Sequence, residues 1–518
     1  MKELIYHRSL LASVDRHADK IGFIDGPVSR TYSQHVGRVS QLANALGNEL
    51  GVARSDRFAV LALNSLPYLE LWHAAFLGGG VINALNLRLA AKELSYILQD
   101  SGTKVCFVDG YFAPLVDAVR KETQIENVVL IGDADVPHDL RYEDVVAAGD
   151  TALPGEPDED DSVVLMYTGG TTGLPKGVLL DQRAEILNMY HVEMAWRFDD
   201  NYVYLHQTPM FHAASMGGIL GIPAAGGTTT FVPMFEPESV MAAIEKHAVT
   251  MTVMVPTMIG LMMGHPNYRA ERLRSLVTLT YGASPMPQAL LQKVLADLPN
   301  AEIYQGYGMT EASAVLTVLG PAEHRAGGDR LRSAGRALPG VALSIQDEQG
   351  HVLSVGETGE VCACTGNLMT EYWNKPDATA EAFRGGWYHT GDAGYIDKAG
   401  YLFLVDRVKD MIVTGGENVY STEVENAIAS HPAVAQVAVI GIPDDVWGEA
   451  VHAIVVLKPD FVATQEDIIG HARSEIAGYK VPKSVEFRAE PLPLSGAMKV
   501  LKRDLRAPYW EGHGRAVN

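Results

Sequence analysis

A glycine-rich loop directly after an apolar segment carries the clearest chemical signal in this sequence. The loop reads Tyr-Thr-Gly-Gly-Thr-Thr-Gly-Leu-Pro-Lys-Gly over residues 167–177 and follows the apolar run 163–166. Its glycines permit positive φ angles, so consecutive backbone N–H groups can converge on an anion, while hydroxyls and a lysine add donors and charge. The pattern predicts a polyphosphate site made of Thr168, Gly169, Gly170, Thr171, Thr172, Gly173 and Lys176.

Two other interpretations of this loop have to be weighed. In the P-loop of kinases and GTPases the lysine is followed by Ser or Thr, whereas here Lys176 precedes Gly177. The interpretation of this loop as the P-loop of a kinase or GTPase is therefore disfavoured. A surface linker is the second interpretation, because stretches rich in Gly, Ser and Thr usually are linkers. Other motifs must decide between a linker and a phosphate site.

Two further segments combine the residue types that a nucleotide site needs. Residues 305–311 read Gln-Gly-Tyr-Gly-Met-Thr-Glu, in which the ring could stack on adenine, the Thr could bond a phosphate and Glu311 could hold Mg²⁺. Residues 387–392 end in Gly-Asp, and this carboxylate is suited to accept protons from two ribose hydroxyls, with Arg407 bracing the sugar or a phosphate. Each segment also has a simpler interpretation when it is taken alone. Residues 305–311 could be a junction between a strand and a helix that Thr310 caps, and Asp392 could be an ordinary turn residue after a glycine.

Near the C-terminus two segments carry charges at places where the chain could move. The charged pentapeptide 406–410 lies between apolar runs, so we expect its backbone to stay solvated and to rotate as a hinge. Residues 494–506 mix a glycine-containing loop with several cations, most of them expected to be solvated helix charges. One cation swung onto a reacting carboxylate and an α-phosphate would stabilise the charge that develops in the transition state. The spacing alone does not select which cation this is.

The elements that must position these groups alternate between helical and apolar extended patterns. Helix-like segments at 33–50, 65–78 and 91–100 alternate with short apolar runs, which predicts stacked α/β layers. The stretch 133–161, rich in Asp, Pro and Gly, predicts an exposed connection. Beyond residue 356 short strands separated by glycine predict a β-rich subdomain. The last segment predicts a small α+β lid in the order helix, strand, strand, helix, at 422–430, 434–440, 450–457 and 465–476.

Composition limits the classes of protein that this chain can belong to. With 518 residues, 47% of them hydrophobic, it can bury large cores and is too long for one compact domain. A formal net charge of −22 argues against sequence-independent binding of nucleic acids or anionic membranes, because both need basic patches. Nucleotide binding must therefore depend on local positive sites.

Cysteine usage and the chain ends predict a cytoplasmic protein without an integral membrane segment. Cys106, Cys362 and Cys364 are too few for a disulfide framework, and the Cys-x-Cys pair has no further zinc ligands beside it in the sequence. The first residues form no apolar signal core, and the last five carry no peroxisomal or retention signal. The longest uncharged stretches, 213–233 and 249–264, are interrupted by Gly and Pro and fit buried core better than membrane spans.

These motifs, taken in order along the chain, resemble the adenylate-forming superfamily. The sequence is similar to stand-alone acyl-CoA synthetases, among them bacterial fatty-acyl-CoA ligases and 4-coumarate:CoA ligases. The resemblance covers nearly the whole chain. It is carried by residues 86–89, 167–177, 209–212, 281–285, 307–311, 372–392, 406–417 and Lys499.

The resemblance implies a role for each matching residue. The loop from Thr168 to Lys176 would hold pyrophosphate, Glu311 would bind Mg²⁺, and Asp392 and Arg407 would bind the ribose. Lys499 aligns with the adenylation lysine of the superfamily, and His212 with the gate of the acyl pocket. The residues that would frame the adenylate are Ala283, Ser284, Gln305, Gly306, Tyr307 and Thr310.

The resemblance also implies two domains and a hinge. An N-terminal domain, 1–405, would bind ATP and the acid, residues 406–410 would form the hinge at Lys409, and 411–518 would be the C-terminal lid. Gly415, Gly416 and Glu417 match the loop that enters the site for thioester formation. Two positions depart from the superfamily: Met498 stands where Gly usually precedes the catalytic lysine, and Gln182 stands where His is frequent. Lys502 is the alternative to Lys499.

The reaction implied is that of an AMP-forming acyl-CoA ligase. ATP and a carboxylic acid would give acyl-AMP and pyrophosphate, and CoA would then take the acyl group with release of AMP. Adenylation for a carrier-protein thiol is the alternative, and a non-enzymatic nucleotide-binding regulator is a third interpretation. A homodimer is an expectation at the level of the superfamily. The expected walls of the acyl pocket are apolar or small and predict a hydrophobic monocarboxylate, either medium-chain fatty or aryl: His212, Ala213, Gly217, Val255, Thr257, Tyr281, Gly282 and Gly306.

Overall fold

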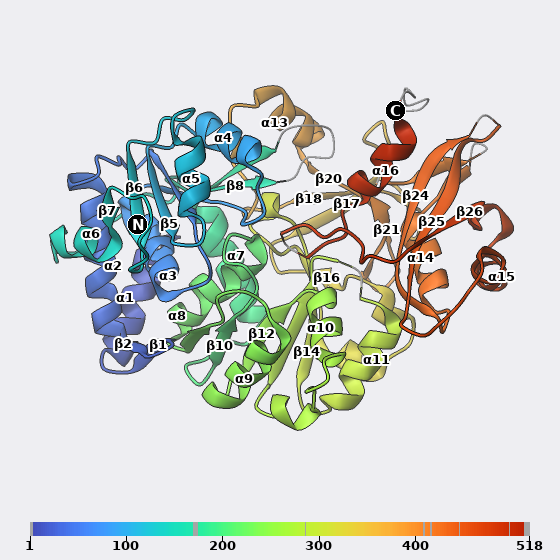
Figure 1. Ribbon diagram of the computed structural model, residues 1–518, viewed down its shortest axis with the longest axis horizontal. Coiled ribbons are helices and arrows are strands. Elements are labelled where there is room, and N and C mark those ends of the chain that lie inside the picture. Colours follow the sequence, from blue (N-terminus) through green and yellow to red (C-terminus); the bar gives the residue numbers. More distant parts are fainter. Residues whose placement is uncertain are drawn as a thin grey trace.

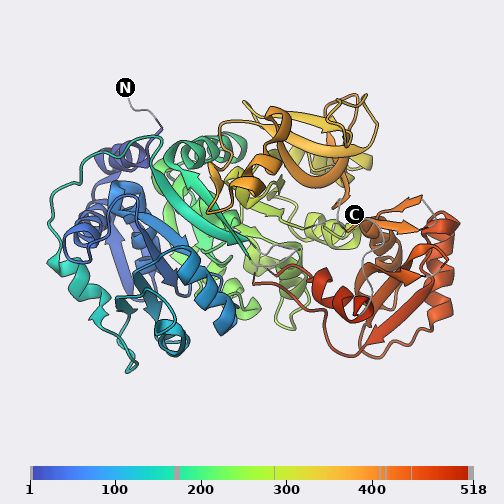
Figure 2. The same cartoon turned by 90° about the horizontal axis from the view of Figure 1, so that it is seen from above.

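The computed structural model describes residues 4–168, 175–284, 286–407, 410–414, 417–444, 446–496 and 498–511, with the backbone alone at 407, 417 and 418. Four β-sheets form its framework. In Figures 1 and 2 the N-terminal layers, the central layers and a β-rich subdomain gather into one body, and the C-terminal domain, in orange and red, lies at its end. The sequence prediction of a large α/β N-terminal domain with a small C-terminal α+β domain is confirmed.

The first large sheet is mainly parallel and has the order β19-β9-β8-β4-β3-β5-β6-β7. Strands β8 and β9 are antiparallel, and they pair Thr168 with Lys176 at the two ends of the glycine-rich loop. The sheet thus delivers both ends of this loop to one edge. Its strands are β3 (Arg57–Leu61), β4 (Val81–Ala84), β5 (Val105–Asp109), β6 (Asn127–Ile131), β7 (Leu140–Arg141), β8 (Ser162–Thr168), β9 (Lys176–Asp181) and β19 (Glu371–Tyr372).

The second large sheet has the order β16-β15-β14-β13-β12-β10-β11-β1-β2, and β10 to β14 run parallel within it. Because neighbouring parallel strands end at the same edge, the motifs that follow β13 and β14 lie beside each other. The strands are β1 (Ile21–Asp25), β2 (Val28–Thr31), β10 (Val203–His206), β11 (Thr228–Phe231), β12 (Met251–Met254), β13 (Thr278–Gly282), β14 (Glu302–Tyr307), β15 (Thr317–Leu319) and β16 (Arg336–Ala337).

Helices cover these two sheets and fill the space between them. The largest apolar cluster joins side chains from both sheets to side chains of α2, α3 and α7. Helix α7 begins where Asp181 Oδ1 accepts a 2.8 Å bond from the N–H of Ala184, an N-cap that supplies an acceptor to the first turn. The helices of the body are α1 (Tyr6–His17), α2 (Tyr32–Asn48), α3 (Leu66–Ala74), α4 (Ala91–Asp100), α5 (Ala113–Arg120), α6 (Tyr142–Ala148), α7 (Gln182–Trp196), α8 (Ile222–Ala225), α9 (Pro237–His247), α10 (Pro256–Met263), α11 (Gln288–Asp297), α12 (Pro321–Ala326) and α13 (Pro376–Ala382).

Shorter helical turns and a third sheet complete the N-terminal body. The turns are η1 (Ala75–Gly79), η2 (Ala213–Ser215), η3 (Gly217–Gly221), η4 (Ala270–Leu273), η5 (Thr310–Ala312), η6 (Asp329–Arg332) and η7 (Arg384–Gly386). The antiparallel third sheet is the predicted β-rich subdomain. It consists of β17 (Ala342–Gln346), β18 (Gly359–Cys364), β20 (Tyr388–Ile396) and β21 (Leu402–Arg407).

The C-terminal domain has its own five-stranded sheet and its own apolar core. The predicted order of helix, strand, strand and helix corresponds to α14 (Ser421–Ala429), β24 (Val434–Asp444), β25 (Gly448–Leu457) and α15 (Gln465–Glu475). The apolar run after the charged pentapeptide is β22 (Ile412–Thr414), and the helix expected to carry the C-terminal cations is α16 (Lys502–Trp510). The sequence analysis did not predict β23 (Glu417–Val419), η8 (Gly478–Lys480) and β26 (Ser484–Arg488). In both ribbon views a red segment leaves this domain and reaches the N-terminal body.

Two local predictions were wrong. The stretch 133–161, expected to be an exposed connection, contains β7 and α6, because Tyr142, Val145 and Val146 supply a buried helical face among polar residues. The backbone of the charged segment 406–410 is not solvated throughout, since Asp406 and Arg407 at the end of β21 pair with β20, and the Asp406 side chain is buried as well. Its Oδ2 accepts hydrogen bonds from the backbone N–H and the hydroxyl of Ser421, the first residue of α14. A carboxylate is favourable at a helix N-terminus, which explains the burial.

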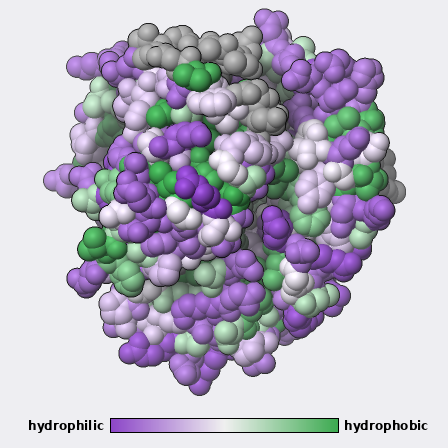
Figure 3. All heavy atoms as spheres, turned by 90° about the vertical axis from the view of Figure 1, so that its right-hand side faces the viewer, coloured by the Kyte–Doolittle hydropathy of each residue, from purple (hydrophilic) through white to green (hydrophobic). Residues whose placement is uncertain are grey.

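One face of the surface can be followed in the space-filling view. The face on the side of the C-terminal domain is mostly hydrophilic and shows separate, small apolar patches (Figure 3). Among the described helices, none combines the length and apolarity that a bilayer crossing requires.

Candidate active site

One large cavity, of about 4050 Å³, lies where the N-terminal body meets the C-terminal domain. The ends of β8 and β9, β13 and β14, and the turn within β20 all open onto it. The structure therefore brings together groups that are far apart in the sequence. The predicted residues that line this cavity are Thr168, Lys176, His212, Ala213, Gly217, Val255, Thr257, Tyr281, Gly282, Ala283, Ser284, Gln305, Gly306, Tyr307, Thr310, Glu311, Asp392 and Lys499.

Several predicted site residues lie outside the described part of the chain. These are Gly169, Gly170, Thr171, Thr172 and Gly173 of the phosphate loop, Lys409 of the hinge, and Gly415 and Gly416 of the proposed CoA loop, together with the side chains of Arg407 and Glu417. The two described ends of the phosphate loop do lie at the cavity. There the ammonium group of Lys176 stands 4.8 Å from the centre of the Tyr372 ring, a cation–π contact that sequence reasoning did not foresee.

The ends of β13 and β14 form a narrow wall at which glycine is required. A Cβ on Gly282 would overlap the carbonyl oxygen of Gly306, its partner on the neighbouring strand. The next residue, Ala283, adopts a left-handed φ of 65°, a conformation that costs a non-glycine residue about 1–2 kcal/mol. The backbone is thus strained where the resemblance places the adenylate.

Tyr307 and Asp392 link the central sheet to the β-rich subdomain. The Tyr307 hydroxyl donates a 2.8 Å hydrogen bond to Asp392 Oδ2, and both side chains are largely buried, with 8% and 7% of their surface exposed. An aromatic ring and a carboxylate at the edge of one cavity suit an adenosine, since the ring can stack and the carboxylate can accept from the ribose hydroxyls.

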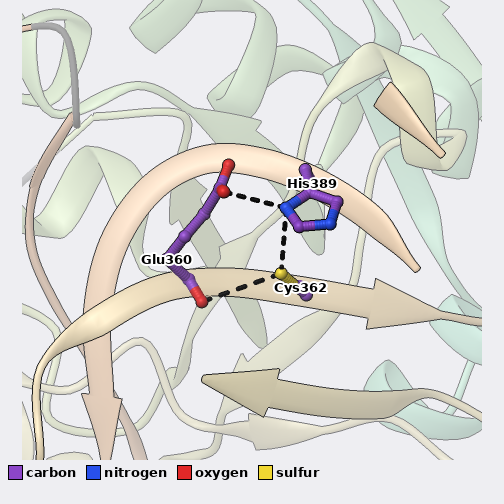
Figure 4. A group of neighbouring side chains, drawn as sticks. All are labelled: Glu360, Cys362 and His389. Atoms are coloured by element: carbon purple, nitrogen blue, oxygen red, sulfur yellow. Dashed lines mark hydrogen bonds and ion pairs between the residues drawn. The ribbon is translucent and has the colours of Figure 1, made fainter. Parts of the chain in front are cut away.

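A cluster of three side chains holds the turn that carries Asp392 (Figure 4). Glu360 and Cys362 lie on β18, and Cys362 pairs in register with His389 of β20. Glu360 Oε2 lies 2.8 Å from His389 Nδ1 and accepts from Arg384 Nη2 at 2.7 Å, while Glu360 Oε1 accepts from the N–H of Gly391 at 3.1 Å. Glu360 therefore fixes the residue directly before Asp392.

The same cluster corrects the expectation that Cys362 has no zinc ligands near it. Cys362 Sγ lies 3.4 Å from His389 Nδ1, and one ligand atom from each of Glu360, Cys362 and His389 falls within 4.8 Å of the others. The cross-strand pairing that brings them together is not visible in the local sequence. Burial raises the pKa of the Cys362 thiol to about 12, and Arg384 already compensates the Glu360 charge, so we interpret the group as a hydrogen-bonded clasp.

Glu311 enters the cavity from η5, directly after Thr310. Its Oε1 accepts a 2.9 Å hydrogen bond from the Tyr372 hydroxyl, and its backbone carbonyl accepts from the N–H of Met369 at 2.8 Å. A carboxylate and the hydroxyls of Thr168 and Thr310 thus line one cavity, and such hard oxygen ligands suit Mg²⁺. Tyr372, which contacts both Glu311 and Lys176, was not assigned a role from sequence.

The segment that carries Lys499 is held against the N-terminal body. Leu494 and Val500 form an isolated antiparallel bridge, and Arg88 Nη1 donates a 2.9 Å hydrogen bond to the carbonyl of Leu494. Arg88 Nη2 also lies 3.6 Å from Met498 Sδ, and Met498 packs against the apolar cluster around β13 and α10. The loop of the small domain is therefore docked on the body.

Lys499 lies close enough to His212 to act on it electrostatically. Burial, and then the positive charge of Lys499, lower the pKa of His212 to about 3. The ring is neutral at physiological pH, and because Nδ1 accepts a 3.2 Å bond from the N–H of Ala214, its proton is on Nε2. Lys502, the alternative lysine, is instead bonded to Glu425 at 2.7 Å and to the hydroxyl of Ser421 at 2.6 Å within its own domain.

The fold is that of adenylate-forming enzymes. A family model described as AMP-binding enzyme matches residues 10–373, and one described as AMP-binding enzyme C-terminal domain matches residues 423–499. The chain belongs to the AMP-binding enzyme family and is an AMP-forming acid–thiol ligase of the acyl-CoA synthetase type.

Relatives along the full length agree with this assignment. The chain is 36% identical to a fatty acid–[acyl-carrier-protein] ligase, ScoC, of Streptomyces coeruleorubidus, over 94% of this chain and 93% of the relative. It is 38% identical to a feruloyl-CoA synthase of Amycolatopsis sp, over 93% of this chain and 95% of the relative. Its fold is similar to that of ATP-bound MatB from Rhodopseudomonas palustris, with a TM-score of 0.87 and 28% identity over 98% of this chain and 99% of that one.

Proposed function

We propose that this protein activates a hydrophobic monocarboxylic acid with ATP and transfers the acyl group to CoA. The observation that carries the proposal is the position of Lys499 beside the predicted acyl pocket. Its positive charge helps to lower the pKa of His212, a residue of that pocket, and Arg88 holds the loop that carries it. A cation in this position would neutralise the acid carboxylate and the α-phosphate as the acid attacks phosphorus, which is stabilisation of the transition state.

Each remaining group has a role in the first half-reaction. The loop from Thr168 to Lys176 would stabilise the departing pyrophosphate, and Tyr307 with Asp392 would orient the adenosine. Mg²⁺ would be held by Glu311 and would neutralise phosphate charge. Neutral His212 would close the acyl pocket at the reacting carboxyl without bringing a second positive charge beside Lys499. The cavity between the two domains would limit the access of water to the mixed anhydride.

The second half-reaction would need the small domain to turn. We propose that rotation about Lys409 withdraws Lys499 and brings Gly415, Gly416 and Glu417 to the site where the CoA thiol attacks the acyl carbonyl. Domain bounds of 1–405, 406–410 and 411–518 follow from this hinge. The docked loop of Lys499 supports an arrangement suited to adenylation.

The walls of the acyl pocket support an apolar acid. No charged side chain occurs among the eight predicted wall residues, all of which the structure describes at the cavity, so nothing there would neutralise a second carboxylate or an amino group. Fatty and aryl acids both satisfy this description, and the feruloyl-CoA synthase relative supports an aryl acid as a candidate.

A carrier protein is the second candidate acceptor, because one relative at 36% identity is a fatty acid–[acyl-carrier-protein] ligase. We also propose a cytoplasmic location, supported by three free thiols, and a homodimer, which light scattering on the purified protein would test.

Measurement of AMP release distinguishes CoA from a carrier protein as the acyl acceptor. The protein would be incubated with ATP, Mg²⁺ and a panel of fatty and aryl acids, with either CoA or a phosphopantetheinylated carrier protein. We expect acid-dependent AMP release with CoA. Release only with the carrier protein would favour the second candidate, and no acid-dependent pyrophosphate exchange with any acid would refute adenylation by this cavity.

A further inference from the structure

Tyr372 lies between two charged groups of the cavity and is fixed at the edge of the first large sheet. It belongs to β19, where it pairs in register with Val178 of β9, two residues beyond Lys176. Its backbone N–H also donates a 2.9 Å hydrogen bond to Thr379 Oγ1 of α13. The side chain lines the cavity, and only 9% of the residue is exposed. A strand and a helix thus hold this tyrosine in place.

The ring and the hydroxyl of Tyr372 contact groups of opposite charge. The ammonium group of Lys176 stands 4.8 Å from the ring centre, and the hydroxyl donates a 2.9 Å hydrogen bond to Glu311 Oε1. Lys176 and Glu311 are both half-buried, and within the part of the chain that the structure describes no ion pair joins them. The face of an aromatic ring attracts a cation, and a phenol proton suits a carboxylate. Tyr372 is therefore a neutral spacer between a cation and an anion.

A second tyrosine fixes the direction of the hydroxyl bond. Tyr388 forms a side-chain hydrogen bond with Tyr372, and burial, followed by the negative charge of Glu311, raises the pKa of Tyr388 well above its usual value. Because Tyr372 has one hydroxyl proton and gives it to Glu311, its oxygen accepts from Tyr388. If the Tyr372 hydroxyl turned away from Glu311, the buried donor of Tyr388 would lose its acceptor, which is costly. The bond to Glu311 is thus supported from behind.

We propose that Tyr372 is a positioning residue that keeps Lys176 and Glu311 apart, so that the lysine stays available to pyrophosphate and the carboxylate to a divalent cation. The inference rests on the proposed function and adds a residue to it. Opposite charges in a partly buried cavity attract each other strongly. A direct ion pair would have to be broken before either ligand binds. It would also cancel a local positive charge, which a protein with a net charge of −22 needs in order to bind a polyphosphate.

The test measures the binding of inorganic pyrophosphate in EDTA by titration calorimetry, a readout that needs neither turnover nor metal. Tyr372→Leu removes both the ring and the hydroxyl. We expect its dissociation constant for pyrophosphate to rise by about tenfold, because Lys176 then pairs with Glu311. In a Glu311→Gln background the same substitution should change this constant by less than about threefold, since no carboxylate remains to capture the lysine. A mere loss of packing would weaken binding equally in both backgrounds.

Trp373→Phe is the matched control on the same strand. The indole of Trp373 contacts Arg57 and donates to the carbonyl of Asp100, so it touches neither charge. We expect its affinity for pyrophosphate to stay within about twofold of the wild type. Wild-type affinity in Tyr372→Leu, an equal loss in both backgrounds, or the same loss in Trp373→Phe would overturn the inference and leave the proposed function intact. A wild-type protein that neither binds pyrophosphate nor exchanges it with any acid would refute the proposed function, and the inference with it.

Tyr372→Phe decides the question if the leucine variant does not fold, as judged by its thermal midpoint. It keeps the ring beside Lys176 and removes the hydrogen bond to Glu311. Pyrophosphate binding in EDTA should therefore stay within about twofold of the wild type, while the Mg²⁺ concentration that half-saturates pyrophosphate exchange should rise by about threefold or more. An unchanged Mg²⁺ dependence, or a tenfold loss of pyrophosphate binding in this variant, would contradict the separate roles of the ring and the hydroxyl.

Discussion

Arg88 donates a 2.9 Å hydrogen bond to the carbonyl of Leu494, so an arginine of the N-terminal body holds the loop on which the small domain carries Lys499. The same loop approaches Asn86 so closely that a Cβ on Gly496 would overlap the Asn86 amide oxygen. The docking is therefore specific in both polarity and shape. Its chemical consequence is that Lys499 is positioned by a contact between domains as well as by its own domain.

Replacement of Lys499 by alanine should separate the two half-reactions. We expect acid-dependent pyrophosphate exchange to fall by about a hundredfold or more, because a preorganised charge at the transition state is lost. Thioester formation from synthetic acyl-AMP and CoA should stay within about threefold of wild type. Lys502→Ala is the comparison, and its loss should appear mainly as reduced stability, since Lys502 is paired with Glu425. Wild-type exchange in Lys499→Ala would refute the assignment.

Met498 permits a test of how its side chain contributes to docking. It adopts a φ of 61°, which costs a non-glycine residue about 1–2 kcal/mol, yet its side chain contacts Arg88 and the apolar cluster of the body. Met498→Ala retains the energetic cost of the positive φ and removes the side-chain contacts. Met498→Gly removes the contacts and also relieves the cost of the positive φ. We expect pyrophosphate exchange to decrease in the order wild type, Met498→Gly, Met498→Ala. An alanine variant as active as the wild type would show that the side chain contributes nothing to docking.

Glu360 is predicted to act on nucleotide binding as a positioning residue, through the turn before Asp392. Glu360→Gln weakens the contacts to His389 and Arg384, so the KM for ATP should rise about tenfold with a smaller change in kcat. Arg384→Gln is the matched control, because the Arg384 side chain is 40% exposed and its ion pair is worth little. Steady-state kinetics at saturating acid would measure both. A change confined to kcat, or an equal effect of the two variants, would contradict this role.

Buried histidines should make the fold sensitive to mild acid. Burial lowers the pKa of His73 to about 4 and that of His206 to about 3. In the unfolded chain these groups have a pKa of about 6.5, so between that value and the folded pKa the unfolded state binds more protons. Their contribution to stability is complete above about pH 6.5 and is lost as the pH falls towards 4.

For His73 the free energy of unfolding should decrease by about 2 kcal/mol when the pH is lowered from 7.5 to 5. Urea unfolding at both values measures it. His206→Phe should flatten the pH dependence, because a phenyl ring can keep the stacking on Phe231, whose ring centre lies 5.3 Å away, and cannot take up a proton. If the free energy of unfolding changed by the same amount between the two pH values in the variant and in the wild type, His206 would not contribute to the acid sensitivity.

The motifs could be predicted because each is local in the sequence. The phosphate loop lies between β8 and β9, and the segments after β13 and β14 lie at the ends of adjacent parallel strands, so their convergence follows from the order of the strands. The helix and strand order of the C-terminal domain was visible for the same reason, since each long element has its own periodicity.

Contacts between distant segments could not be predicted. Glu360 meets His389 only because β18 and β20 pair in one particular register, and Asn188 meets Val315 through the packing of α7 against a loop after β14. Neither pairing leaves a local pattern. The burial of Asp406 depends likewise on Ser421, which its own charged segment does not reveal.

Helix α7 is separate in the chain from every element that carries Lys499, Glu311 or Asp392, yet it supports one of them. Asn188 Oδ1 accepts from the N–H of Val315 in the loop after β14, and Trp196 lies beside Gly306 at the end of that strand. Substitutions at Asn188 or Trp196 would therefore disturb the framework of the adenylate site together with the wall of the cavity, and a library aimed at new acids is better directed elsewhere.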